Sequence, residues 1–266
     1  MPIREGRHTA APAVRYVLAV LGLPPAVTTC LFDLDGVLTQ TAEVHAAAWK
    51  EMFDGFLRRR AAASGAQFIP FDAVRDYDEY VDGKPRSDGV RSFLASRGIE
   101  LPEGGPDDGA DAETIAGMGR RKNEIVLKMI REHGVKAYEG SVRYVTAVRD
   151  AGLHRIVVSS STNARDVLAA AGIADLFEEV IDGHVAERDH LAGKPAPDTY
   201  LAGAAAAGAQ PARAAVFEDA LAGVEAGRAG GFAVVVGVDR VGQADALRAH
   251  GADRVVADLS ELIERQ

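Results

Sequence analysis

The sequence predicts an α/β fold: a doubly wound, Rossmann-like parallel sheet core that carries an inserted α-helical cap domain. Two observations lead to this prediction. The β-branched and apolar run 28–32 ends abruptly in Asp33, Asp35 and Gly36, which is the pattern of a buried strand that opens onto a loop. From about residue 138 onward, helical and strand-like segments alternate, which indicates right-handed βαβ crossovers and parallel strands.

The order of the segments predicts two domains. The core comprises residues 1–39 and 138–266, and the cap comprises residues 40–137, where no strand is expected. A loop rich in Gly, Pro and Asp, 98–113, interrupts the cap. We expect cap helices over about 42–60, 89–97 and 114–132. We expect further core strands at about 155–159, 179–181, 214–217, 232–236 and 254–256, and core helices at about 142–151, 164–171, 197–207 and 221–229.

Composition restricts the classes of partner. The chain has 266 residues, 47% of them hydrophobic, which is enough for a large core. Its formal net charge of -9 argues against nucleic acid or an anionic membrane as a partner. The apolar run 16–23 predicts an amphipathic helix and not a signal peptide, so we expect a cytoplasmic protein. The single cysteine, Cys30, is expected to be a buried apolar residue. The oligomeric state stays open, and a monomer is compatible with the sequence.

Two pairs of acidic residues follow predicted strands. Asp33 and Asp35 follow the first strand, and Glu218 and Asp219 follow the strand at 214–217. The carboxyl ends of parallel strands meet at one edge of a sheet, where ligands bind. Neighbouring carboxylates repel each other unless a cation joins them, and Mg²⁺ takes such oxygens while it keeps positions for a phosphate. Taken singly, D-x-D-G also fits a plain turn or part of a calcium loop.

Two further polar groups belong to the same edge. Ser159, Ser160, Ser161 and Asn163 follow the second strand and open a helix, so hydroxyls and helix amides can meet an anion there. Lys194 precedes a helix that prolines begin, which leaves its ammonium free to reach the strand ends. The alternatives are helix capping for the serines and a solvated side chain for the lysine.

The predicted cap holds four candidate residues. His45 and Trp49 are four residues apart and share a helix face. Arg86 lies in a compact polar turn, and Lys122 lies on the third cap helix. Packing within the helix is the alternative for His45 and Trp49, and a solvated charge is the alternative for Arg86.

The four core motifs together resemble the haloacid dehalogenase superfamily of phosphotransferases. They are Asp33-x-Asp35-Gly36, Ser159, Lys194 and Glu218-Asp219, and their order and spacing match over nearly the whole chain after residue 28. Within the superfamily the chain is most similar to the β-phosphoglucomutase family. Supporting segments are TAEVHAAAWK at 41–50 and RKNEIVLKMI at 121–130.

The resemblance implies a division of catalytic roles. Asp33 would be the nucleophile that forms an aspartyl-phosphate. Asp35 would be the general acid and base, and its backbone carbonyl would bind Mg²⁺. Ser159 and Lys194 would bind the oxygens of the transferring phosphoryl group. The residues implied to hold Mg²⁺ are Asp33, Asp35, Glu218 and Asp219.

The resemblance also implies how substrate is bound. Arg86, Ser161 and Asn163 would grip the phosphate that is not being transferred, while His45 and Lys122 would line the closed site and couple closure to Asp35. The complete substrate-binding set is His45, Trp49, Arg86, Lys122, Ser160, Ser161 and Asn163. The expected partners are therefore a small sugar phosphate and a sugar bisphosphate.

Two positions depart from the family pattern. Thr162 stands where the mutases have lysine, and Gln40 replaces the usual aspartate after the first motif. Loss of the lysine is expected to cost about 1.5–3 kcal/mol of a charge-assisted contact, unless Lys84 or Arg120 compensates.

The expected activity is a Mg²⁺-dependent mutase that interconverts β-glucose 1-phosphate and glucose 6-phosphate through a 1,6-bisphosphate. Arg86, His45 and Lys122 favour this activity. The alternative is a sugar-phosphate phosphatase, in which water attacks the aspartyl-phosphate, and Thr162 favours it. A non-catalytic binding protein would have lost a motif acid, and none is lost. Dehalogenation is disfavoured as the activity, because that reaction needs neither a metal nor the acid at Asp35.

Overall fold

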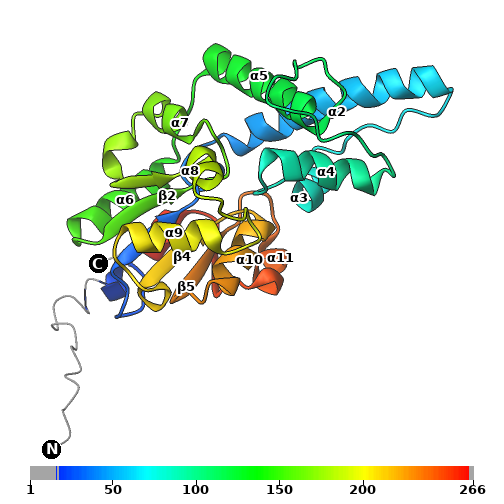
Figure 1. The fold of residues 1–266 in the computed structure, drawn as a ribbon. Helices are drawn as coiled ribbons and strands as arrows, with labels where there is room; N and C mark the ends of the chain where they lie inside the picture. Colours follow the sequence, from blue (N-terminus) through cyan, green and yellow to red (C-terminus); the bar gives the residue numbers. More distant parts are fainter. Residues whose placement is uncertain (1–15, 17, 264–266) are drawn as a thin grey trace, which may run out of the picture.

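A six-stranded parallel sheet forms the centre of one lobe of the computed structural model, which describes residue 16 and residues 18–263 (Figure 1). The strand order is β3-β2-β1-β4-β5-β6, and every neighbouring pair is parallel. The predicted fold class is therefore confirmed. The strands are β1 (Thr29–Phe32), β2 (His154–Val158), β3 (Glu179–Ile181), β4 (Ala214–Glu218), β5 (Val234–Val238) and β6 (Arg254–Val256).

Helices cover both faces of this sheet and bury it. All residues of β1 and β4 are buried, and an apolar cluster lies on each face. Buried parallel strands of this kind are apolar throughout their length and do not alternate. The helices of this lobe are α6 (Glu139–Asp150), α7 (Ala164–Ala170), α8 (Gly183–Arg188), α9 (Asp198–Ala206), α10 (Leu221–Ala229) and α11 (Ala244–His250), with short 3₁₀ turns at Ala174–Leu176, Pro211–Arg213 and Leu259–Leu262.

Three details of this lobe differ from the prediction. Helices α8 and α11 were not expected, because each has at most seven residues and shows no apolar periodicity. Strand β5 begins two residues later than predicted and runs through Gly237. A Cβ at Gly237 would lie 3.2 Å from Ala252 and 3.3 Å from Leu247, so close packing explains a glycine inside this strand.

The second lobe consists of helices alone. They are α2 (Ala42–Ser64), α3 (Arg75–Tyr80), α4 (Arg86–Ser96) and α5 (Ile115–His133). Helices α2 and α5 pack against each other around an aromatic and aliphatic cluster. The loop between α4 and α5 contains no regular structure, as the sequence predicts, whereas α3 was not expected. Figure 1 places this lobe beyond one end of the sheet, over the loops that carry the motifs.

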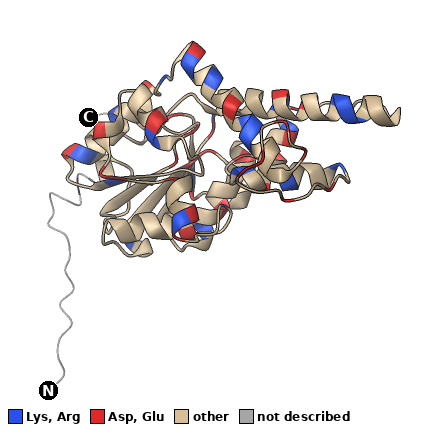
Figure 2. Ribbon diagram, turned by 45° about the horizontal axis from the view of Figure 1, so that its top comes forward, with Lys and Arg blue, Asp and Glu red and all other residues tan. Residues whose placement is uncertain are grey.

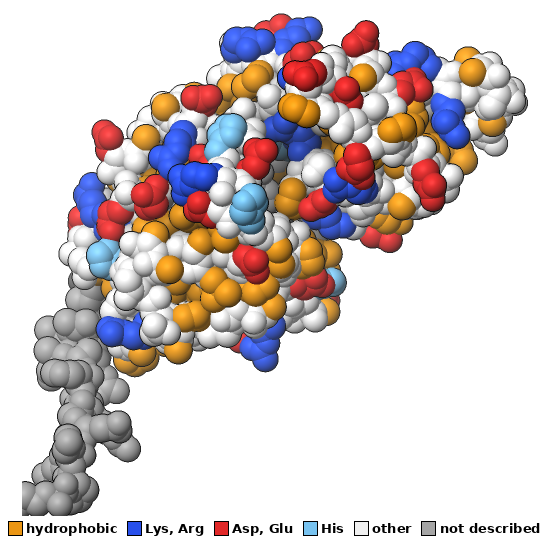
Figure 3. Space-filling model, viewed as in Figure 1, with side chains coloured by type: hydrophobic (Ala, Val, Ile, Leu, Met, Phe, Trp, Pro, Cys, Tyr) orange, Lys and Arg blue, Asp and Glu red, His pale blue; other side chains and the backbone are white. Residues whose placement is uncertain are grey.

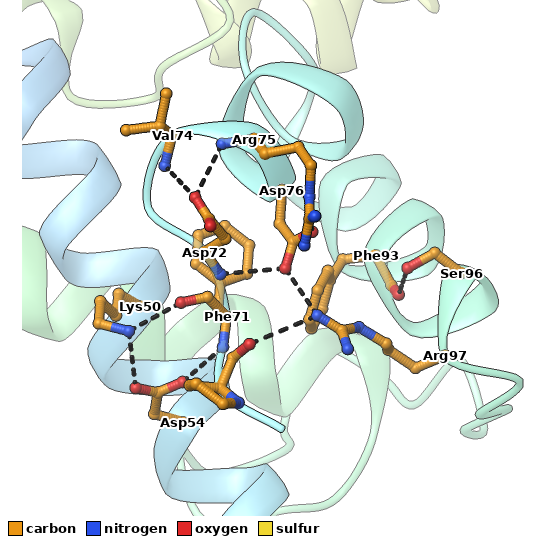
Figure 4. A network of polar contacts seen from close by, with 11 residues as sticks. Lys50, Asp54, Phe71, Asp72, Val74, Arg75, Asp76, Phe93, Ser96 and Arg97 are labelled. Carbon is orange, nitrogen blue, oxygen red and sulfur yellow. Dashed lines mark hydrogen bonds and ion pairs between the residues drawn. The ribbon is translucent and has the colours of Figure 1, made fainter. Parts of the chain in front are cut away.

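A network of buried charges fixes the segment that leads into α3 (Figure 4). Asp54 of α2 is 4% exposed, accepts a 2.7 Å hydrogen bond from the Phe71 amide and pairs with Lys50 at 3.1 Å. Asp76 is 3% exposed and pairs with Arg97 of α4 at 2.6 Å. Buried carboxylates persist when they are paired in this way. The contacts hold the chain between α2 and α4 in one position just before the turn at 81–86.

Two antiparallel connections join the lobes. The Gln40 amide donates to the Lys136 carbonyl at 2.8 Å, and the Tyr138 amide donates to the Leu38 carbonyl at 2.9 Å. These hydrogen bonds lie at the predicted boundaries 39/40 and 137/138. The division of the chain into core and cap domains at those residues stays a prediction.

Charged residues of both signs are interspersed along the helices of both lobes, and the sheet carries few of them (Figure 2). Within the part of the chain that is described, no helix has the length and apolar character needed to cross a bilayer. The predicted helix 16–23 lies partly outside the described residues.

Candidate active site

The predicted motifs meet around the ammonium group of Lys194. This side chain is 2% exposed, and its Nζ donates to Asp33 Oδ1 and to Glu218 Oε1, each at 2.5 Å. Asp33 directly follows β1 and Glu218 ends β4, so neighbouring strands bring the two acids together. Burial lowers the pKa of Lys194, but the charges of Asp33 and Glu218 outweigh it and raise the pKa. The lysine is therefore a permanent cation among carboxylates.

A third carboxylate leaves this site with excess negative charge. Carboxylate oxygens of Asp33, Glu218 and Asp219 lie within 4.8 Å of one another, and all three residues are buried. Burial raises the pKa of Asp33 well above its ordinary value, against the opposing charge of Lys194, while Glu218 and Asp35 add to the rise. Burial and neighbouring acids likewise raise the pKa of Asp219. One lysine does not neutralise three acids, so the residues present fit a divalent cation.

Gly36 makes room for this cluster. Its φ of +87° lies in the left-handed region, and a Cβ on it would overlap the carboxylate of Asp219. Only glycine meets both requirements without strain. The Gly of the D-x-D-G motif is thus required by the acid pair that follows β4.

Asp35 turns away from the carboxylate cluster and faces the helical lobe. Its Oδ1 accepts a short hydrogen bond from the Thr41 hydroxyl and lies 3.6 Å from His45 Nε2. The other ring nitrogen, Nδ1, lies 2.9 Å from Lys122 Nζ. Because a protonated lysine only donates, Nδ1 accepts and Nε2 carries the proton toward Asp35. Lys122, His45 and Asp35 thus form a line from α5 to the end of β1.

The histidine in this line is uncharged. Burial and then the charge of Lys122 lower the pKa of His45 to about 4, although Asp35 opposes the shift. Trp49 lies on the same face of α2, with Lys122 Nζ 4.9 Å from the centre of its ring. A Cβ at Gly89 would lie 3.1 Å from the indole, so Trp49 also packs between α2 and α4.

The serine loop after β2 forms a turn that contacts the helical lobe. The Ser161 amide donates to Ser159 Oγ at 3.1 Å. Ser160 Oγ donates to the Gly83 carbonyl at 2.8 Å, and Asn163 Nδ2 donates to Asn123 Oδ1 of α5 at 2.8 Å. The serine loop therefore both caps its own turn and contacts the helical lobe.

Arg86 begins α4 and meets this loop from the other side. One guanidinium nitrogen donates to Thr162 Oγ1 at 2.8 Å and to Asn123 Oδ1 at 3.0 Å. Both acceptors are neutral, and among the described residues no carboxylate pairs with Arg86. Burial lowers its pKa, and the nearby charge of Arg120 lowers it further. The charges of two guanidinium groups thus act on each other, and neither Arg86 nor Arg120 forms an ion pair among the described residues, which is an arrangement that suits an anion.

One cavity between the lobes collects most of the predicted residues. Figure 3 shows the surface hollowed between the lobes, with Lys and Arg side chains beside the hollow. Lys194 and Glu218 lie beneath the cavity and do not line it. The predicted residues that line it are Asp33, Asp35, His45, Trp49, Arg86, Lys122, Ser159, Ser160, Ser161, Asn163 and Asp219.

Sequence reasoning missed several residues of the site. Tyr77, Asp82 and Asn123 also line the cavity. The hydroxyl of Tyr200 donates to Glu218 Oε1 at 3.1 Å. Asn123 follows Lys122, which was a usable signal. Nothing in the sequence distinguishes Tyr77 or Asp82 from the acidic and aromatic residues around them.

A family model described as haloacid dehalogenase-like hydrolase matches residues 27–231. The chain belongs to this family. Within it, the chain is 57% identical over 247 residues to a β-phosphoglucomutase of Mycobacterium tuberculosis, which covers 92% of this chain and 94% of the relative. A β-phosphoglucomutase of Bacillus subtilis is 31% identical over 87% of this chain and 90% of the relative. The crystal structure of β-phosphoglucomutase from Clostridium difficile superposes with a TM-score of 0.69 at 25% identity, covering 89% of this chain and 93% of that one.

The chain is therefore an enzyme similar to β-phosphoglucomutase or to a related sugar-phosphate hydrolase. Its chemistry is phosphoryl transfer on a sugar phosphate.

Proposed function

We propose that the enzyme is a Mg²⁺-dependent mutase that interconverts β-glucose 1-phosphate and glucose 6-phosphate through a 1,6-bisphosphate. One observation carries this proposal: two cations serve the cavity at separate places. Lys194 contacts the nucleophile from beneath the cavity, and Arg86 lines the cavity with no acid among the described residues as its partner. A bisphosphate that turns over end for end needs a phosphate site at both places, whereas hydrolysis of one phosphate needs a single site.

Asp33 is the proposed nucleophile. Its carboxylate attacks the phosphorus of the bound phosphate, the bond from phosphorus to the sugar oxygen breaks, and an aspartyl-phosphate results. Lys194 Nζ, 2.5 Å from Asp33 Oδ1, stabilises the charge that collects on the transferring oxygens. The Ser159 hydroxyl and the loop amides that follow it are proposed to bind the same oxygens.

Asp35 is the proposed proton carrier. It gives a proton to the departing sugar oxygen and takes one from the hydroxyl that attacks next. His45, held in one tautomer by Lys122 at 2.9 Å, places its buried Nε2 3.6 Å from Asp35 Oδ1, where it makes no hydrogen bond, and we propose that the two groups approach when substrate binds. Both contacts come from the helical lobe, so we propose that the proton carrier is positioned only when the lobes are together.

Asp33, Glu218 and Asp219 are the proposed Mg²⁺ ligands, together with the backbone carbonyl of Asp35. The ion would screen the repulsion between an anionic nucleophile and an anionic phosphate.

Arg86 and Asn123 are proposed to bind the second phosphate, with Ser161 and Asn163 beside them. We propose Arg120 as the replacement for the missing lysine at 162, because Arg120 lies with Arg86 and Thr162 along an adjoining cavity, although its guanidinium also donates to the Pro106 carbonyl. Lys84 Nζ instead donates to the Glu79 carbonyl and to Ser92 Oγ, both at 3.2 Å.

A sugar-phosphate phosphatase is the second candidate, and Thr162 is the observation that favours it. Its hydroxyl accepts a hydrogen bond from Arg86 but brings no charge. A weakly held second phosphate would leave the aspartyl-phosphate open to water. A cytoplasmic location and a monomeric state are further proposals of ours.

The first test incubates the enzyme with Mg²⁺, β-glucose 1-phosphate and a trace of the 1,6-bisphosphate, while glucose 6-phosphate and free phosphate are measured together. We expect glucose 6-phosphate far in excess of free phosphate. Free phosphate as the main product would establish the phosphatase instead, and neither product would refute the assignment to glucose. An Asp33→Asn variant is the blank, because it lacks the nucleophile.

Arg86→Ala tests the second phosphate site. We expect formation of glucose 6-phosphate to fall at least about tenfold, since a charge-assisted contact is lost, while release of free phosphate falls much less. Arg91→Ala is the control, because Arg91 lies on the same helix but pairs with Glu103 at the surface. An equal loss of both products in Arg86→Ala would show that Arg86 only holds the lobes together.

A further inference from the structure

Asp82 is a carboxylate in the cavity that the mechanism above does not use. It lies in the turn between α3 and α4, where the helical lobe meets the other lobe. It lines the same cavity as Asp33, Asp35 and Asp219. An acid added to a cavity that already holds three is unfavourable for binding phosphate, so its presence requires a reason.

No cation accounts for Asp82. Among the described residues, no Lys, Arg or His forms an ion pair with it, whereas Asp54 and Asp76 of the same lobe are both paired. Burial and then the charge of Glu218 raise the pKa of Asp82 to about 7. The hydroxyl of Tyr77 lies beside it as a neutral neighbour. Asp82 therefore forms no ion pair that would stabilise the helical lobe, and stabilisation of that lobe does not explain its presence.

The turn that carries Asp82 is held firmly against the core loops. The next residue, Gly83, accepts the 2.8 Å hydrogen bond from Ser160 Oγ. A Cβ on Gly83 would lie 3.1 Å from the Cβ of Ala220, which follows the Glu218-Asp219 pair. Asp82 is thus placed at a fixed position relative to the nucleophile, as a group that discriminates between ligands must be.

The part of the ligand that Asp82 can bind follows from its charge. A carboxylate accepts hydrogen bonds and repels phosphate, so its partner must be a neutral donor. A sugar phosphate offers such donors only in its ring hydroxyls. The two oxygens of one carboxylate can accept from two adjacent hydroxyls, and the Tyr77 hydroxyl can accept or donate beside them.

We propose that Asp82, with Tyr77 beside it, binds ring hydroxyl groups of the sugar phosphate and sets which sugar the enzyme accepts. This inference rests on the proposed function, since it assigns the sugar-binding part of the same cavity. It names a specificity-determining residue and not a further member of the phosphate sites.

Deoxy sugars test the proposal. The wild type, Asp82→Asn and Asp82→Ala are assayed with β-glucose 1-phosphate and with its 2-, 3- and 4-deoxy analogues. We expect the wild type to discriminate about 10- to 100-fold in kcat/KM against at least one analogue, because that analogue leaves a buried acceptor unpaired. Asp82→Ala should lose most of this discrimination, and Asp82→Asn, which keeps one acceptor oxygen, should lose part of it.

Acetyl phosphate provides the control for folding and chemistry. It transfers its phosphoryl group to Asp33 with release of acetate, and water then releases phosphate, so no sugar hydroxyl takes part. Both Asp82 variants should keep this hydrolysis within about twofold of wild type. Glu79→Gln removes one exposed acid from the same lobe and should leave the sugar discrimination unchanged.

Three results would overturn the proposal. Equal losses with all sugars and with acetyl phosphate would make Asp82 a structural residue. Weaker Mg²⁺ binding by calorimetry in Asp82→Asn would place it at the metal. Unchanged discrimination in Asp82→Ala would remove it from sugar recognition. If the wild type turns over acetyl phosphate but none of the sugar phosphates, the proposed function fails, and the proposal for Asp82 fails with it. The three results above concern Asp82 alone and leave the proposed function standing.

Discussion

Single residues of this site owe their properties to partners that lie far away in the sequence. Lys194 stays charged because Asp33 and Glu218, 161 and 24 residues away, both accept from its ammonium. His45 stays neutral because it is buried and because Lys122, 77 residues away, donates to its ring. Removal of either cation would leave a buried group without its partner, which costs more than the net contribution of the contact.

Lys122 should give the reaction its decline at high pH. Burial and, to a lesser extent, the charge of Arg86 together lower the pKa of Lys122 to about 7. The ammonium is therefore charged below about pH 7 and neutral above it, so the cation that faces the phosphates and fixes His45 disappears as pH rises. We expect kcat/KM of the wild type to fall above about pH 7. Lys122→Met should have a lower kcat/KM at every pH, but its kcat/KM should not show the part of the decline that comes from Lys122.

The control for this profile is Lys128→Met, which removes an exposed lysine from the same helix. Asp82 titrates in the same range, but it is present in all three proteins and cancels from the comparison. A profile of Lys122→Met that parallels the wild type would show that another group causes the decline. Lys122 also affects the free energy of unfolding. Between about pH 7 and the ordinary pKa of 10.5, the unfolded chain binds more protons at this lysine than the folded chain does. The destabilisation that Lys122 causes therefore becomes smaller as pH rises through this range.

Among the elements, the turn between α3 and α4 is the one on which contact between the lobes depends. Gly83 has φ +69°, and its carbonyl accepts from Ser160. Gly65 ends α2 with a similar φ of +70°, but nothing lies within 4 Å of a Cβ placed there. A substitution at Gly65 therefore introduces backbone strain alone, whereas the same substitution at Gly83 introduces backbone strain and steric crowding.

Gly83→Ala should impair catalysis, and Gly65→Ala should not. Both variants should lose about 1 kcal/mol of unfolding free energy, because alanine is strained at positive φ. Gly83→Ala should also lower kcat/KM at least about tenfold, since its methyl group meets Ala220 3.1 Å away and keeps the lobes apart. Denaturant unfolding and steady-state kinetics on both variants measure the two effects. Equal kinetics for the two would contradict a role for close contact at Gly83.

The whole molecule is two lobes with a cluster of uncompensated acids between them. Asp33, Glu218 and Asp219 are buried with a single lysine in direct contact with two of them. Burial of the acids and repulsion among them oppose folding, and both raise the pKa values of Asp33 and Asp219, burial more than repulsion. A cation that binds only the folded chain relieves this repulsion and stabilises the fold by mass action.

Mg²⁺ should therefore raise the melting temperature. At a concentration about a hundredfold above its Kd, the gain in unfolding free energy is about 2.7 kcal/mol. KCl at the same ionic strength should give little of this shift, and Asp219→Asn should reduce it. Scanning calorimetry with and without Mg²⁺ measures it, and an equal shift with KCl would mean that the cluster holds no divalent ion.

The sequence by itself determined the sheet and the chemistry at its edge. Buried strands such as 29–32 are apolar throughout and end in polar residues, so both their position and their functional end are written locally. The order of the segments also predicted the inserted helical lobe, and the family resemblance added the likeness to the mutases. Prediction was wrong for short helices such as α8, where a few residues carry no periodic signal.

Only the tertiary structure decided how the two lobes complete one site. No local pattern shows that Thr162 accepts from Arg86, or that Arg120 lies with them along an adjoining cavity while Lys84 donates to Ser92. Asp82 was likewise one acid among many until the fold placed it in the cavity that the nucleophile also lines. These contacts join residues tens of positions apart, and their energies depend on burial and distance, which the order of residues does not specify.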